Sequence, residues 1–223
     1  MAESNRIEFP GHDGGLLAAR LAALVEQGIG VLRFDFTGLG NSEGDFSNTN
    51  FTTNVQDLVA AAEWLDQAHG GPQLLIGHSL GGAAVIVAAH DIPQVKAVVT
   101  IGAPSDAAHV INAIRTHVEQ IEDEGEAEVQ LAGRPFVLKR QFLDDVRGAN
   151  VTEAAAGLKR PLLVMHAPLD ETVGIGNATA LFVAARHPKS FISLDKADHL
   201  LTSPGDAQRA GKLIAVWAEP YVF

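Results

Sequence analysis

Short apolar runs alternate with stretches of helical periodicity along most of the chain, and this alternation limits the possible folds more than any other feature. Strands separated by helices form βαβ units, which place parallel strands in one sheet with helices on both faces. The runs that indicate strands are residues 6–9, 16–21, 30–36, 73–76, 97–101, 161–166 and 190–194. The sequence therefore predicts an α/β fold with a doubly wound, mainly parallel sheet.

Helix starts support the same plan. Thr53 and Gln56 have the spacing of a capping box ahead of the apolar positions of the first long helix. Ser203, as N-cap, and Pro204, at the first helical position, mark the start of the last helix. No repeat, low-complexity tract or flexible linker interrupts the chain, so we expect one domain over residues 1–223.

The alternation breaks between residues 104 and 158. This stretch is expected to hold a helix at about 107–121, an acidic turn at 122–126, and a hairpin of residues 127–131 and 136–139 that turns at Gly133. Ligands usually enter such folds at the carboxyl edge of the sheet. We interpret the segment as a small lid-like insertion above that edge; an ordinary helical connection is the alternative.

Composition excludes several classes of function. The chain has no cysteine, which excludes disulfides, thiol catalysis and cysteine-based metal sites. Its net charge of −11 disfavours nucleic-acid binding. No apolar run reaches the roughly 20 residues of a membrane helix, and the amino terminus lacks the apolar core of a secretory signal. We therefore expect a cytoplasmic protein that does not bind membranes. No histidine pair has zinc-ligand spacing with a matching acid, so we expect no metal. We expect no cofactor.

The segment from Gly77 to Gly81, Gly-His-Ser-Leu-Gly, matches the G-x-S-x-G nucleophile elbow. The serine of such an elbow occupies a strained strand-to-helix turn, and glycines on either side allow the backbone and helix to approach closely. Here the motif follows the predicted strand 73–76 and precedes a predicted helix over 82–89. That context favours Ser79 as a nucleophile over a purely structural glycine turn.

A serine hydroxyl needs a base to take its proton, and a carboxylate to orient that base. In this fold the chain order is Ser, then Asp or Glu, then His. Asp170 follows the predicted strand 161–166, and His199 follows the strand 190–194, so both reach the edge that carries Ser79. We predict Asp170 as the acid and His199 as the base. Glu171 stays an alternative acid, whereas Asp195 and Asp198 are expected to shape the loop of His199.

Three segments together resemble the α/β-hydrolase superfamily of serine esterases: residues 77–82, residues 33–44 and residues 197–199. More narrowly, the whole chain resembles bacterial hydrolase domains that are often fused to an OsmC-like domain, although no OsmC-like domain is expected within these residues. The resemblance implies the same three catalytic positions and activity on esters or thioesters.

One region departs from the family pattern. Family members place a further strand and an oxyanion loop between the amino-terminal hairpin and the strand before Asp35, and about thirty residues fewer are present here. Residues 22–28 instead indicate a short helical piece after Leu21. We expect the strand 30–36 to lie beside the elbow strand. Its loop of residues 36–38 would then supply the second oxyanion donor beside the Leu80 N–H.

These observations predict a carboxylesterase that cleaves small-molecule esters of small to medium acyl chains through an acyl-enzyme. A thioesterase, amidase or peptidase with the same three residues is one alternative. A catalytically degenerate hydrolase fold that acts as a binding module is the other.

Overall fold

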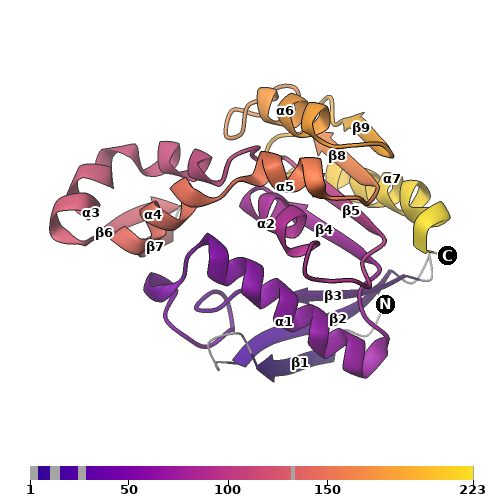
Figure 1. Ribbon diagram of the computed structural model, residues 1–223, viewed down its shortest axis with the longest axis horizontal. Helices are drawn as coiled ribbons and strands as arrows, with labels where there is room; N and C mark the ends of the chain where they lie inside the picture. Colours follow the sequence, from indigo (N-terminus) through magenta and orange to yellow (C-terminus); the bar gives the residue numbers. More distant parts are fainter. Residues whose placement is uncertain (1–4, 11–15, 25–28, 132–133, 223) are drawn as a thin grey trace.

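The β structure of the described residues forms three separately hydrogen-bonded sheets (Figure 1). The computed structural model describes residues 5–10, 16–24, 29–131 and 134–222. The central sheet is parallel, with strand order β4-β5-β8-β9. Its strands are β4 (Leu74–His78), β5 (Ala97–Ile101), β8 (Leu162–His166) and β9 (Lys189–Ser193). The predicted α/β class and mainly parallel sheet are confirmed.

Helices cover both faces of the central sheet. They are α1 (Phe51–His69), α2 (Leu80–Ala88), α6 (Gly176–Ala184) and α7 (Pro204–Val222). Val98 and Val99 are neighbours on β5, both fully buried, yet they belong to two different apolar clusters. Val98 packs in the cluster that includes α1, α2 and α6, whereas Val99 packs in the cluster that includes α7. Burial on both faces explains why this strand is a continuous apolar run.

The amino-terminal sheet is antiparallel, with order β1-β2-β3. Its strands are β1 (Asn5–Pro10), β2 (Leu16–Leu24) and β3 (Ile29–Phe34). The prediction of a helical piece at 22–28 is wrong for Ala22–Leu24, because those residues pair with β3 up to Leu24 opposite Ile29. A short connection suffices between antiparallel strands, so no crossover helix is needed. The predicted turn at 11–15 and residues 25–28 lie outside the described residues.

The expected position of β3 beside the elbow strand is also wrong. β3 is hydrogen-bonded to β2, and β4 is an edge strand of the central sheet. A cavity of about 670 Å³ lies between them, lined by β3, β4 and residues of α1 and α7. Ile76, on the poorly covered face of β4, keeps 45% of its surface exposed.

The first long helix begins three residues earlier than its predicted capping box. Asn50 is the N-cap of α1: its side chain accepts from Thr53 N, and its own N–H donates to Thr53 Oγ1, both at 2.8 Å. Thr53 is therefore the third residue of the box rather than the first. Asn is among the strongest N-cap residues, and capping here lets Phe51 begin the helix with a buried side chain.

Within residues 104–158, residues 107–148 form an outlying lobe of 3₁₀- and α-helix with one hairpin, whereas the last helix of the stretch packs on α2 and α6 in the body of the fold (Figure 1). The elements of this stretch are η2 (Ala107–His117), α3 (Val118–Glu124), β6 (Glu126–Leu131), β7 (Arg134–Lys139), α4 (Arg140–Gly148) and α5 (Val151–Gly157). The hairpin pairs as predicted, although its turn at 132–133 lies outside the described residues. The helix expected at 107–121 is instead a 3₁₀ segment followed by α3, with non-helical geometry at Ile114.

The lobe packs on the start of α1 and on the 3₁₀ turn η1 (Phe46–Asn48) before it. Asp145 of α4 accepts from Thr52 N at 2.8 Å, and the Phe136 and Phe46 rings lie 4.8 Å apart. Placing a carboxylate at the amino terminus of α1 satisfies a helix N–H that has no intrahelical acceptor. The lobe is thus fixed to the body of the fold, while its role as a lid stays a prediction.

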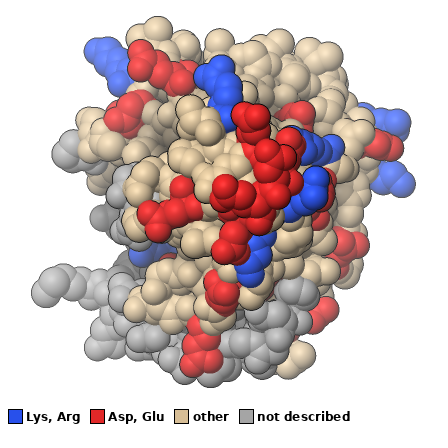
Figure 2. Space-filling model, turned by 90° about the vertical axis from the view of Figure 1, so that its left-hand side faces the viewer, with Lys and Arg blue, Asp and Glu red and all other residues tan. Residues whose placement is uncertain are grey.

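Acidic side chains gather on the face that the lobe presents (Figure 2). They include the exposed residues Glu119, Asp123, Glu124, Glu126 and Glu128 of α3 and β6. This face would repel the phosphate backbone of a nucleic acid. Among the described helices, none has the length and apolarity that a membrane span requires.

Candidate active site

Ser79 lies in the turn between β4 and α2, at the carboxyl end of the central sheet. Its backbone has φ 54° and ψ −129°, a conformation that residues other than glycine rarely adopt. Such strain costs on the order of 1–3 kcal/mol and persists where the surroundings fix it. Ser79 N donates to Ile101 O at 2.9 Å, which holds the turn against the end of β5.

The glycines around Ser79 differ in what they permit. A Cβ on Gly77 would lie 2.2 Å from Gly81 O, and a Cβ on Gly82 would lie 2.6 Å from Ala103 Cβ. A Cβ on Gly81 would meet no atom within 4 Å. The turn therefore needs glycine at 77 and 82 for close packing, whereas Gly81 contributes the backbone that Gly77 must approach. The predicted steric reason holds for one flanking glycine of the motif and not for the other.

Two alanine substitutions test this difference. Gly77→Ala is expected to lower the free energy of unfolding by about 3 kcal/mol, because backbone atoms must move to admit the methyl group. Gly81→Ala is expected to raise it by about 0.5–1 kcal/mol, since alanine is a better helix former than glycine. Urea denaturation of both variants measures the pair. Equal losses, or a larger loss for Gly81→Ala, would contradict the assignment.

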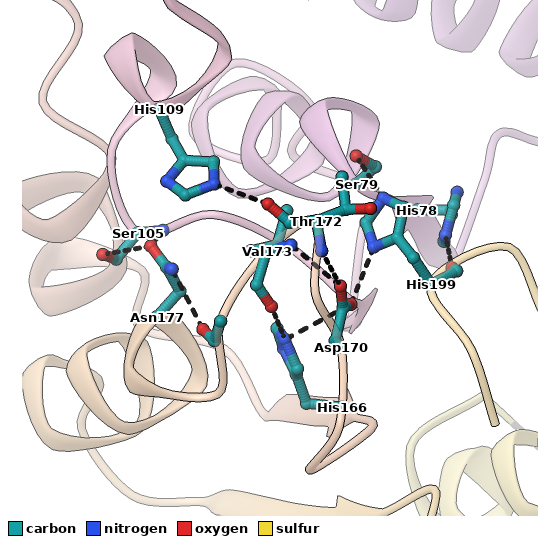
Figure 3. Close-up of polar contacts among 11 residues, drawn as sticks. His78, Ser79, Ser105, His109, His166, Asp170, Thr172, Val173, Asn177 and His199 are labelled. Atoms are coloured by element: carbon teal, nitrogen blue, oxygen red, sulfur yellow. Dashed lines mark hydrogen bonds and ion pairs between the residues drawn. The ribbon is translucent and has the colours of Figure 1, made fainter. Parts of the chain in front are cut away.

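The structure brings the three predicted site residues into one chain of hydrogen bonds (Figure 3). Ser79 Oγ lies 3.0 Å from His199 Nε2, and His199 Nδ1 lies 2.7 Å from Asp170 Oδ2. Asp170 stands on the loop after β8, and His199 on the loop between β9 and α7. Because Nδ1–H donates to the carboxylate in the neutral ring, Nε2 has a lone pair that can accept the serine proton.

The loop of Asp170 fixes the carboxylate from its other side. Thr172 N and Val173 N donate to Asp170 Oδ1 at 2.9 and 2.8 Å, and the Asp170 side chain is 1% exposed. Burial is the largest influence on the pKa of Asp170 and alone would raise it. The hydrogen bonds from Val173, His199 and Thr172 and the attraction of the His199 ring together outweigh burial, so the pKa of Asp170 lies below its ordinary value. Asp170 is therefore built to stay ionised.

A second histidine lies beneath this acid loop. His166, the last residue of β8, is fully buried, and its Nε2–H donates to Val173 O at 2.7 Å. The same nitrogen is 3.6 Å from Asp170 Oδ2. Its Nδ1 is buried without a hydrogen-bond partner. His166 thus braces the residue whose amide holds Asp170, a role that its place in an apolar strand did not indicate.

The other carboxylates near the site take the lesser roles expected of them. Asp198 accepts from the amide and hydroxyl of Thr202, and Asp195 accepts from the hydroxyl of Ser193, so both shape the loop around His199. Glu171 is exposed beside Asp170. Its side chain is not part of the hydrogen-bonded chain that joins Asp170 to Ser79.

Leu80, the predicted oxyanion donor, is the first residue of α2, so its N–H has no acceptor within the helix. The second donor expected from residues 36–38 is not supported. Thr37 N donates to the buried carboxylate of Asp57 at 2.9 Å, and Gly38 N donates to Glu43 O at 2.9 Å. Thr37 N therefore fixes this loop to α1, and Gly38 N is bonded within the loop, so both amides already have acceptors.

Besides His166, sequence reasoning missed two residues that contact the site or the loop of Asp170, namely Gly102 and His109. Gly102, with φ 57°, follows β5, and a Cβ there would lie 3.3 Å from His199 Nδ1 and 3.4 Å from Asp170 Oδ2. Its place at the same strand-end edge as the other site residues was the available signal. His109 Nε2 of η2 is 2.9 Å from Thr172 O. Nearby, Ser105 donates through its N–H and hydroxyl to Asn177 Oδ1, a contact that includes none of Ser79, Asp170 and His199 (Figure 3). No sequence pattern foretold those long-range contacts.

Within the described residues, no cluster of three or more His, Cys, Asp or Glu side chains could hold a metal ion. The three site residues supply an ionised carboxylate, an oriented imidazole and a hydroxyl at the amino terminus of a helix. This set suits nucleophilic attack on a carbonyl carbon.

Comparison with known proteins adds a family and several relatives. Residues 11–125 match the family described as "Serine aminopeptidase, S33" (Hydrolase_4). The crystal structure of the esterase domain from a Rhodothermus marinus protein is 41% identical, with a TM-score of 0.79, and the match covers 99% of this chain and 100% of that one. Mouse α/β-hydrolase domain-containing protein 10 has a TM-score of 0.79 at 19% identity, covering 97% of this chain and 99% of that one, which is a likeness of fold.

Curated relatives share part of the sequence. The mitochondrial palmitoyl-protein thioesterase ABHD10 of Bos taurus is 29% identical over 131 residues, and that of Mus musculus is 28% identical over 180 residues. The matches cover 57% and 75% of this chain. They span only 40% and 59% of the lengths of those two relatives.

Proposed function

Because the chain belongs to the serine aminopeptidase S33 family of α/β hydrolases, we propose that it hydrolyses carboxylic esters of small to medium acyl chains. Ser79, His199 and Asp170 carry the reaction. The observation that supports this most is the continuous contact of 3.0 and 2.7 Å from hydroxyl to imidazole to buried carboxylate. The similarity to a structure titled as an esterase domain points the same way.

The reaction proceeds in two halves. Ser79 Oγ attacks the ester carbonyl while His199 Nε2 takes its proton, and Asp170 holds the ring in the required tautomer. The Leu80 N–H donates to the oxyanion of the tetrahedral intermediate. The intermediate collapses as His199 returns the proton to the leaving alcohol. Water then attacks the acyl-enzyme with His199 again as base, releasing the acid and restoring Ser79.

Thioester hydrolysis is the second candidate. The same three residues suffice for it, because a thiolate leaves more readily than an alkoxide. The ABHD10 relatives are named palmitoyl-protein thioesterases. The family description also makes amide bonds a candidate substrate. The alternative to ester, thioester and amide hydrolysis is a protein of this fold that binds ligands without cleaving them.

One experiment separates these outcomes. One portion of wild-type protein is incubated with a fluorophosphonate, and a separate, untreated portion is assayed with p-nitrophenyl butyrate, a matched butyryl thioester and an amino-acid p-nitroanilide. We expect the phosphonyl group on Ser79 by peptide mass spectrometry, and faster turnover of the oxygen ester than of the other two. Faster thioester or anilide turnover would replace the substrate class. Folded protein with neither label nor turnover would identify a binding module.

A further inference from the structure

His78, the residue between Gly77 and Ser79 of the motif, has its own contact with the base. Its Nε2 lies 2.6 Å from the backbone carbonyl oxygen of His199. The two imidazole rings are 4.9 Å apart at an interplanar angle of 44° (Figure 3). A carbonyl oxygen only accepts hydrogen bonds, so His78 must donate from Nε2.

This contact ties the loop of His199 to the sheet. At the start of that loop, Leu194 N donates to His166 O of β8 at 2.9 Å. The hydrogen bonds closer to His199 in the described part of the loop are internal, and join Ala197 to Leu194, Leu201 to Asp198, and Thr202 to the Asp198 side chain. They shape the loop without fixing it to β4. The His199 ring reaches Ser79 and Asp170, but a ring can rotate about its side-chain bonds, so a fixed backbone narrows where the ring can lie.

Resting on the function proposed above, we infer that His78 is a positioning residue that holds the backbone of the base at a set distance from the nucleophile. His78 is bonded covalently to Ser79, and Ser79 N is fixed to Ile101 O at 2.9 Å. One dipeptide therefore places both the hydroxyl and, through the His199 carbonyl, the imidazole that activates it. A misplacement of about 1 Å between reacting groups can cost about 10²-fold in rate.

The charge state of His78 suits this role. The pKa of His78 lies below its ordinary value, chiefly because its ring has lost part of its water, and the neighbouring His199 ring lowers it further. The His199 carbonyl and the Asp170 charge act in the opposite direction. A neutral imidazole donates to the carbonyl without adding a positive charge 4.9 Å from the ring that becomes positive during catalysis. A lysine or arginine at position 78 would donate equally well but would add that charge.

Three variants test the inference. His78→Phe keeps a ring but loses the donor, and His78→Gln keeps an amide N–H at the same number of bonds from Cα. His90→Phe is the matched control, because His90 Nε2 makes a similar 2.9 Å contact, to Ala154 O, away from the site. For p-nitrophenyl butyrate we expect His78→Phe to lower kcat by about 10- to 100-fold with KM changed less than about threefold. His78→Gln should recover most of kcat, and His90→Phe should keep it.

A second measurement does not depend on activity. Hydrogen–deuterium exchange of the peptide covering residues 195–203 should become faster in His78→Phe, and stay as in wild type in His78→Gln and His90→Phe. If wild type neither turns over esters nor reacts with fluorophosphonate, the proposed function fails, and exchange alone decides the role of His78. Unchanged exchange in His78→Phe, an effect confined to KM, or no recovery in His78→Gln would overturn the inference.

Discussion

Replacement of Ser79 by alanine is expected to lower kcat for p-nitrophenyl butyrate by about 10⁴- to 10⁶-fold. The variant loses the atom that forms the acyl-enzyme, and His199 is left without a hydroxyl to activate. Stopped assays with long incubation measure the residual rate against buffer. Fluorophosphonate labelling should disappear in parallel.

Ser105→Ala is the matched control for that loss. Ser105 also follows a strand of the central sheet at its carboxyl end, but its hydroxyl donates to Asn177 Oδ1 at 3.0 Å and faces no base. We expect its kcat to stay within about threefold of wild type, as for a substitution outside a reacting group. Ser79 would be excluded as the nucleophile if Ser79→Ala kept more than a tenth of wild-type activity. The same conclusion would follow if Ser105→Ala lost as much activity as Ser79→Ala.

Asp170→Asn is expected to lower kcat by about 10⁴-fold while the fold is kept. The asparagine amide can present an N–H toward His199 Nδ1, which favours the tautomer with its proton on Nε2. That nitrogen can then no longer accept the serine proton. Glu171→Gln tests the alternative acid: we expect almost full activity, because Glu171 is exposed beside the site. The reverse order of effects would move the acid to Glu171.

Asp170→Asn is also expected to change how the free energy of unfolding depends on pH. The pKa of Asp170 is depressed in the folded protein. Its ionised form therefore stabilises the fold at pH values above the unfolded value of about 3.9, and that contribution is lost as the pH falls toward the folded pKa. The advantage of wild type over Asp170→Asn in urea denaturation should be constant from pH 7 to about pH 5 and shrink below pH 4. An advantage that grows on acidification would contradict the depressed pKa.

Much of this site follows from chain order and strand ends. Ser79, Asp170 and His199 could be chosen because parallel strands bring their carboxyl ends to one edge, and the structure places all three within hydrogen-bonding distance. The predicted α/β-hydrolase fold is confirmed by the family and structural likenesses. The catalytic roles of Ser79, Asp170 and His199 are predictions that the variants above test.

Other features depend on tertiary contacts that no local pattern contains. Ala22–Leu24 has the composition of a helix, but pairing with β3 makes it a strand, since sheet contacts override weak intrinsic propensity. Thr53 could cap a helix, yet Asn50 three residues earlier does so more favourably. The contact of His78 with a carbonyl 121 residues away could not be read from a motif that leaves its position open.

The space between β3 and β4 divides the backbone hydrogen bonding of the protein. In the described chain, the ladders of β1–β3 and of β4, β5, β8 and β9 share no strand, so opening one breaks no ladder bond of the other. The two are expected to behave as separate foldons in native-state amide exchange. Because Ser79, Asp170 and His199 all belong to the second, the catalytic geometry can outlast a sub-global opening of the first.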